Sequence, residues 1–255
     1  MPFVIWCNQR SGSTHLSSLL ASHPQIFCWR ELFFAGEAGS AEDYFTRSKC
    51  SDLRIFLDRF FSSEWAAINL CEERPTTKQP RAVGFKLKYQ QVERYPGVGQ
   101  YLLSGRSTIR IIHLVRVNLL AALVSARILP LVFARFKDAN VLADTPLDGF
   151  QPAIRLDPTT LYFDLDFLMS ELTRAREFAA NFNTIEVTYE DLVRNFSSTS
   201  ECLLRFLSLN DSTSVLQSRY RKLLPRQPLA SISNKREVRI ALQGTRFEGC
   251  LSEWS

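Results

Sequence analysis

The sequence lacks the patterns that several common classes of protein require. Its six cysteines include no Cys-x-x-Cys pair, which argues against zinc-finger and thioredoxin-type sites and favours free thiols in a reducing, cytoplasmic setting. Its three histidines form no metal-binding pattern, and no metal is expected in the site. No run of five or more basic residues occurs, so we do not expect a nucleic-acid-binding protein.

Signals for a membrane or a secretory route are also weak. The longest apolar stretch, residues 119–136, is interrupted by Arg127, Pro130 and Arg135, which makes it a poor transmembrane segment. The first strand-like run begins at Val4, so no signal peptide is expected. We therefore expect no transmembrane segment.

The overall composition is that of an ordinary globular chain. Apolar residues make up 45% and charged residues 22% of the 255 positions, as in a typical domain. We expect residues 1–255 to form one α/β domain, with a P-loop-like central parallel sheet and helices on both faces. The net charge of +5 suits an anionic ligand.

Residues 4–20 contain the strongest local signal. An apolar run is followed by small polar residues around Gly12, and then by Leu16, Leu19 and Leu20 at helical spacing. This pattern predicts a strand, a tight loop and a helix, an arrangement that binds a phosphate-like anion with backbone N–H groups and the helix dipole. The expected ligands are Arg10, Ser11, Gly12, Ser13, Thr14 and the backbone of His15.

The loop departs from the nucleotide-binding loop of common kinases. Cys7 stands where that motif has its first glycine, and Ser13 stands where it has its lysine. A kinase-type phosphotransferase is therefore disfavoured, although strand–loop–helix phosphate sites are shared with kinases. An ordinary strand–turn–helix with a serine at its start also stays open.

Residues 10–14 resemble the phosphosulfate loop of sulfotransferases, which use 3′-phosphoadenosine 5′-phosphosulfate (PAPS) as the donor. Residues 23–33 resemble a second motif of one branch, the bacterial carbohydrate sulfotransferases that act on nodulation factors and on trehalose. In that branch the residue matching Glu31 is the proposed catalytic base. The alternative is a surface carboxylate paired with Arg30. The histidine base of the cytosolic sulfotransferases has no candidate here.

Two further strands add basic side chains to this resemblance. Residues 82–89 predict a strand with Lys86 and Lys88 on one face, and the phrase around Lys86 resembles a segment near the active site of the same branch. An edge strand with solvated lysines is the alternative. Residues 108–116 predict a buried strand followed by a helix, and Arg116 with Ser125 matches the family's 3′-phosphate site.

The later part of the chain resembles the same branch less specifically. Residues 189–192 match a segment that we interpret as structural. Family members close the nucleotide site with a late basic loop, for which the candidates are Arg221, Lys222, Asn234 and Lys235. A solvated basic tail is an equally good interpretation for each of the four.

The resemblance implies a PAPS-dependent sulfotransferase. Glu31 would accept the proton of a hydroxyl on a carbohydrate or glycolipid-like acceptor, while Arg10 and Lys86 would stabilise charge on the leaving phosphate of the product PAP. A non-catalytic PAP-binding protein is the second alternative, beside the kinase. The sequence identifies neither the acceptor nor the oligomeric state, and aromatic residues that look exposed could form a homodimer interface or a lid.

Overall fold

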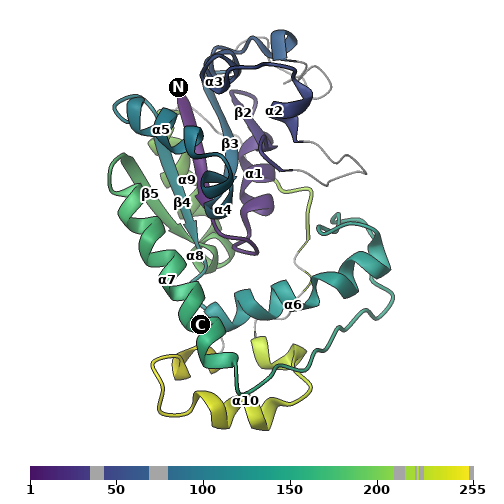
Figure 1. Cartoon of the computed structure of the whole chain (residues 1–255). Helices are drawn as coiled ribbons and strands as arrows, with labels where there is room; N and C mark the ends of the chain where they lie inside the picture. The colour runs from purple at the N-terminus through teal and green to yellow at the C-terminus, as the bar shows by residue number, and fades with distance from the viewer. Residues whose placement is uncertain (35–42, 69–79, 210–215, 222, 224–226, 253–255) are drawn as a thin grey trace.

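A single parallel sheet forms the centre of the molecule. The computed structural model describes residues 1–34, 43–68, 80–209, 216–221, 223 and 227–252. Within these residues, five strands lie in the order β2-β3-β1-β4-β5, and each strand is parallel to its neighbours (Figure 1). The strands are β1 (Pro2–Cys7), β2 (Ile26–Glu31), β3 (Ala82–Lys88), β4 (Arg110–Val115) and β5 (Asn183–Thr188). The predicted α/β fold with a central parallel sheet is confirmed.

Helices follow the strands along the chain. The α-helices are α1 (Ser13–Ala21), α2 (Tyr44–Arg47), α3 (Leu53–Phe61), α4 (Tyr89–Arg94), α5 (Pro96–Ser104), α6 (Leu119–Phe136), α7 (Leu161–Ala179), α8 (Tyr189–Arg194), α9 (Phe196–Phe206) and α10 (Lys235–Leu242). The described part of the chain also contains the short 3₁₀ helices η1 (Trp65–Ile68), η2 (Pro228–Ser231) and η3 (Glu248–Leu251).

The side chains of β1 alternate between two hydrophobic cores, as successive residues of a strand must. Val4 and Trp6 pack on one face of the sheet with residues of α3, α5 and α7. Phe3 and Ile5 pack on the other face with residues of α1, α8 and α9. Both faces of the sheet are therefore covered, which explains the near-continuous apolar sequence of the central strands.

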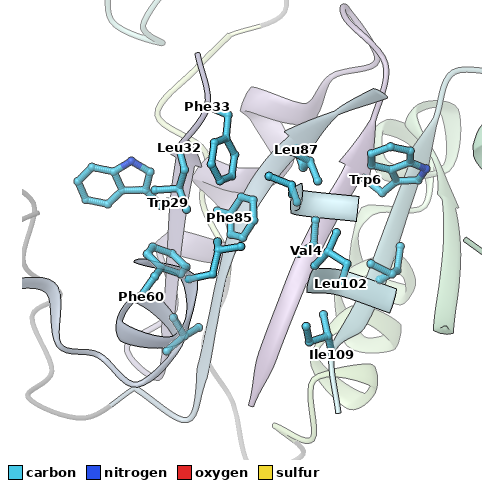
Figure 2. Close-up of a cluster of buried hydrophobic side chains, with 14 of the residues drawn as sticks. Val4, Trp6, Trp29, Leu32, Phe33, Phe60, Phe85, Leu87, Leu102 and Ile109 are labelled. Carbon is cyan, nitrogen blue, oxygen red and sulfur yellow. The ribbon is translucent and has the colours of Figure 1, made fainter. Parts of the chain in front are cut away.

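The first of these cores is rich in aromatic rings. Figure 2 shows Trp29, Phe33, Phe60 and Phe85 grouped beside β2 and β3. The rings of Phe60 and Phe85 meet edge-on at a centroid distance of 5.5 Å, a geometry that stabilises aromatic pairs. This packing fixes the strands that deliver side chains to the site.

A third core lies beyond the carboxyl end of the sheet, where α6, α7, α10, η2 and η3 pack together (Figure 1). By length and composition helix α6 could cross a membrane, but half of its residues are buried inside the protein, as in a core helix. It continues through Pro130 to Phe136.

The sheet order brings the functional candidates together. Strand β3 lies between β2 and β1, so the edge-strand alternative for Lys86 is wrong, and its side chain is buried. The carboxyl ends of parallel strands meet at one edge of a sheet. The loop after β1 and the last residues of β2, β3 and β4 therefore converge there.

Candidate active site

The loop between β1 and α1 has the backbone of an anion-binding loop. Arg10 and Gly12 both take positive φ values, 58° and 89°, and the Ser11 hydroxyl donates to the carbonyl of Asn8 at 2.9 Å. Gly12 is the N-cap of α1 and has no side chain with which to cap the helix. The first N–H groups of α1 are therefore oriented to bind an anion.

Tyr189, the first residue of α8, packs against this loop. A Cβ atom on Gly12 would lie 2.3 Å from Cδ2 of Tyr189, so the residue at position 12 must be glycine for this contact to form. The same ring lies 4.8 Å from the guanidinium of Arg116, within range of a cation–π interaction. Tyr189 thus positions both the loop and Arg116.

Glu190 fixes the backbone that follows Arg116. Its carboxylate accepts the N–H groups of Val117 at 3.1 Å and Asn118 at 3.2 Å. These residues lie at the start of α6, whose N-cap is Asn118. The segment predicted to be structural therefore holds the strand end that carries Arg116.

Arg10, Arg116 and Ser125 form a connected group. Nη1 of Arg116 donates to the carbonyl of Arg10 at 3.0 Å, and Nε of Arg10 donates to Oγ of Ser125 at 3.0 Å. Nη1 of Arg10 also donates to the carbonyl of Ala139 at 3.4 Å. Burial lowers the pKa of both arginines, and for Arg10 the charge of Arg116 adds to this effect; both stay cationic.

Arg116 has a donor to spare. Its Nε is buried and has no hydrogen-bond partner within the described part of the chain. A buried guanidinium donor left unpaired is costly, and a phosphate oxygen is a suitable acceptor for it. The group of Arg10, Arg116 and Ser125 therefore fits a phosphorylated ligand.

An irregularity in β2 brings Glu31 into the site. The register between β2 and β3 shifts between Trp29 and Glu31, so that Arg30 is an extra residue and Glu31 pairs with Lys86. In a regular strand Glu31 would share the face of Trp29, which lies in the first core. The bulge turns Glu31 to the opposite face, where Lys86 lies.

The carboxylate of Glu31 is buried and fully engaged with basic and amide groups. Its Oε1 lies 2.8 Å from Nζ of Lys86, and its Oε2 lies 3.0 Å from Nζ of Lys88 and 2.8 Å from Nε2 of Gln91. Burial alone would raise the pKa of Glu31, but the charges of Lys86 and Lys88 outweigh it and hold the pKa below its ordinary value. The alternative of a surface carboxylate paired with Arg30 is therefore wrong.

Lys86 links this carboxylate to the loop. Its Nζ also donates to Oγ1 of Thr14 at 3.0 Å. The ammonium group therefore lies between Glu31 and the first turn of α1. A cation at this point can stabilise negative charge that develops on a group bound in the loop.

These groups line one cavity of about 550 Å³. Its polar part contains Arg10, Gly12, Ser13, Thr14, His15, Glu31, Lys86, Lys88, Arg116, Ser125 and Arg221. Its apolar part contains Leu19, Leu192, Val193, Phe196, Leu216 and Leu223. A cavity of this size with convergent cations and an apolar end suits a nucleotide-sized anion.

The structure separates the late basic candidates. Arg221 lines the cavity and donates to the carbonyl of Thr145 at 3.0 Å, and Lys222 lies outside the described residues. Asn234 does not line the cavity: its amide pairs with the backbone of Leu156 at 2.7 and 3.1 Å. Lys235 is exposed at the start of α10. The structure therefore does not bring Asn234 and Lys235 to the cavity.

The site also involves Lys88, Gln91 and Tyr189, which were not among the predicted site residues. Lys88 was recognisable as the second lysine on the face of Lys86. Gln91 is the third residue of α4, the position from which a glutamine side chain caps a helix. The cap was detectable in the sequence, but the contact with Glu31 depends on the sheet order.

Comparison with known proteins identifies the fold. No protein-family model matches the chain, and no curated protein matches its sequence. The sulfotransferase domain from the curacin biosynthetic pathway superposes with a TM-score of 0.50 at 17% identity, over 100% of this chain and 90% of that one. A sulfotransferase from Alicyclobacillus acidocaldarius gives 0.47 at 14% identity, over 98% of each chain. The fold and the predicted resemblance agree, and the chain has the fold of the sulfotransferases.

Proposed function

We propose that this protein transfers a sulfonate group from PAPS to a hydroxyl group of a carbohydrate or glycolipid-like acceptor. The observation that carries the proposal is the convergence of Arg10, Arg116, Ser125 and Lys86 on the cavity that also contains the carboxylate of Glu31. Cations for two anionic groups and a candidate base are thus present in one site.

The residues around the loop would hold the donor. The N–H groups of the loop and α1, with Thr14, suit the 5′-phosphosulfate, while Arg116 and Ser125 suit the 3′-phosphate. The unpaired Nε of Arg116 supports this assignment. When bound, PAPS supplies the sulfonate group and leaves as PAP.

Glu31 would act as the general base. Its low pKa keeps it ionised at neutral pH, so it can accept the proton of the acceptor hydroxyl as the new oxygen–sulfur bond forms and the bond to the phosphate oxygen breaks. Lys86 and Arg10 would balance the negative charge that builds on the phosphate. The resemblance of residues 23–33 to the carbohydrate sulfotransferases supports a sugar hydroxyl as the acceptor.

Thermal stabilisation by nucleotides tests the donor site. PAP and AMP differ by the 3′-phosphate alone, so PAP should raise the melting temperature far more than AMP at the same concentration; a ligand at a hundred times its Kd adds about 2.7 kcal/mol to stability. Equal shifts of the melting temperature with PAP and AMP would refute the assignment of a 3′-phosphate site. A shift with ATP and none with PAP would favour a kinase.

Glu31→Gln tests the base. Turnover is measured with [³⁵S]PAPS and a panel of trehalose, chitotetraose and octyl glucoside as acceptors. The variant should turn over about 10²- to 10⁴-fold more slowly than the wild type and should still bind PAP. Glu237→Gln, at an exposed carboxylate on α10, is the matched control. Full activity in Glu31→Gln would exclude the base assignment, and transfer to no member of the panel by the wild type would exclude the acceptor class.

A further inference from the structure

The side chain of Gln91 contacts both the backbone and the candidate base. Gln91 is buried in the first turn of α4 and does not line the cavity. Its Oε1 accepts the N–H of Lys88 at 2.9 Å, and its Nε2 donates to Oε2 of Glu31 at 2.8 Å. One amide therefore connects the start of a helix to the carboxylate in the site.

The backbone fixes which way this amide points. The N–H of Lys88 is a donor and requires an oxygen opposite it, so Oε1 must face Lys88 and Nε2 must face Glu31. The opposite orientation would place two donors together at Lys88 and two acceptors together at Glu31. Because a lysine side chain cannot accept, the reciprocal half of a capping box cannot form, and the helix cap depends on Gln91.

The amide also makes the two oxygens of Glu31 unequal. A carboxylate oxygen has about two acceptor positions. Oε2 accepts from both Lys88 and Gln91, whereas Oε1 accepts from Lys86 alone among the described residues. Oε1 therefore retains a position that can take a proton, and it lies beside the lysine that contacts Thr14.

Few other charged groups act on Glu31 within the described chain. Lys86 and Lys88 come from β3, and from β1 the buried thiol of Cys7 is close enough for the charge of Glu31 to affect its pKa. Asp43, the N-cap of α2, is instead bonded to Tyr95 and to the N–H of Thr46. Among the residues that the structure describes, the donors on Glu31 are thus the two lysines and Gln91.

We propose that Gln91 is a positioning residue for the proton transfer: its amide, oriented by the N–H of Lys88, occupies Oε2 of Glu31 and leaves Oε1 to accept the proton of the acceptor hydroxyl. The proposal rests on the proposed function of the cavity. It assigns to a helix cap a second role, the selection of the oxygen that acts as the base.

Gln91→Glu separates the two roles of the amide. The glutamate keeps an oxygen for the N–H of Lys88, so the cap is retained, but it places a second carboxylate oxygen against Glu31. Gln91→Met removes both the cap and the donor. Gln100→Glu makes the same change in charge at an exposed position of α5 and is the control.

The titration of Glu31 is measured directly by ¹³C NMR of labelled glutamate carboxyl groups, with Glu31→Gln providing the assignment. Two carboxylates at hydrogen-bond distance raise each other's pKa, so the titration should move to higher pH in the order wild type, Gln91→Met, Gln91→Glu. For Gln91→Glu we expect the titration of Glu31 to shift by more than one pH unit. The acidic limb of the pH profile of kcat/KM, measured with [³⁵S]PAPS and the acceptor panel, should shift by the same amount. PAP affinity should stay within about twofold of that of the wild type, because Gln91 lies outside the cavity lining.

The outcomes separate this proposal from the proposed function. If Gln91 has a structural role alone, Gln91→Met should lose more activity than Gln91→Glu at all pH values, and that result would overturn the proposal. An unchanged titration of Glu31 in Gln91→Glu would also overturn it, as would an equal shift in Gln100→Glu. If the titration of Glu31 shifts in Gln91→Glu but the acidic limb of kcat/KM does not, Glu31 is not the base and Gln91 has no role in positioning it. No sulfonate transfer by the wild type would refute the proposed function, whereas the titration would still decide whether Gln91 controls Glu31.

Discussion

Replacing Gly12 with alanine should destabilise the protein more than the same change at another glycine with a left-handed backbone. At φ 89° an added methyl group incurs backbone strain, and its Cβ would lie 2.3 Å and 2.7 Å from two carbons of the Tyr189 ring. The ring cannot move freely, because it is buried and stacked on Arg116. The free-energy costs of the backbone strain and of the steric overlap should therefore add.

The magnitude follows from these two contributions. A left-handed backbone costs an alanine about 1–2 kcal/mol, and forcing an extra methyl into a packed site costs about 1–3 kcal/mol more. Gly244 supplies the control, because its φ is 71° and no atom of the described residues lies within 4 Å of a Cβ added there. Gly244→Ala should therefore show the backbone cost alone, and the difference between the variants should be about 1–3 kcal/mol.

Urea denaturation of both variants provides the assay. Any effect of alanine on the unfolded chain is shared by the two substitutions and cancels in the comparison. In a Tyr189→Leu background the excess cost of Gly12→Ala should shrink, as expected for residues in contact. Equal losses for Gly12→Ala and Gly244→Ala would refute the argument that Tyr189 restricts position 12.

Two further predictions concern charge. Arg116→Ala should weaken PAP binding by about 10- to 100-fold, the value of a charged hydrogen bond, but AMP binding far less, as measured by calorimetry; an equal loss for both ligands would contradict the 3′-phosphate assignment. Burial lowers the pKa of His113 to about 4, whereas a histidine in the unfolded chain has a pKa of about 6.5. As the pH drops, the unfolded state therefore binds a proton at a higher pH than the folded state does. The free energy of unfolding should consequently fall between about pH 6.5 and pH 4. His113→Gln should flatten that dependence in urea denaturation, and an unchanged slope would show that His113 is not its source.

The strands and helices could be predicted because each is encoded locally. The strands predicted over residues 82–89 and 108–116 are β3 and β4, whose ends differ from the predicted bounds by at most two residues. The periodicity of apolar residues over such segments specifies their type. Strand order is not encoded locally, so Lys86 could equally have been an edge residue or, as found, a buried one.

The geometry around Glu31 could not be predicted for a related reason. Strict alternation along residues 26–31 would have placed Glu31 on the face of Trp29, away from Lys86. Nothing in the sequence marks Arg30 as the extra residue of a bulge. The resemblance to a known motif pointed to Glu31, whereas the alternation of the strand alone would have placed its side chain on the face away from the site.

Similarly, the basic character of residues 221–236 was a poor guide to their position. Asn234 is committed to the backbone of Leu156, a contact across more than seventy residues that composition cannot reveal. Arg221 reaches the cavity because its backbone N–H pairs with the carbonyl of Val141. Long-range contacts with the backbone therefore place Arg221 at the cavity and Asn234 away from it.

The parallel sheet also has a consequence for synthesis of the chain. The cavity is lined by residues from Gln9 to Leu223, and β1, which carries the loop, is central and pairs with strands made much later. Such non-local pairing folds slowly compared with local structure. A nascent chain should therefore be unable to bind a nucleotide until most of it has been synthesised, and ligand binding during translation would report completion of the whole domain.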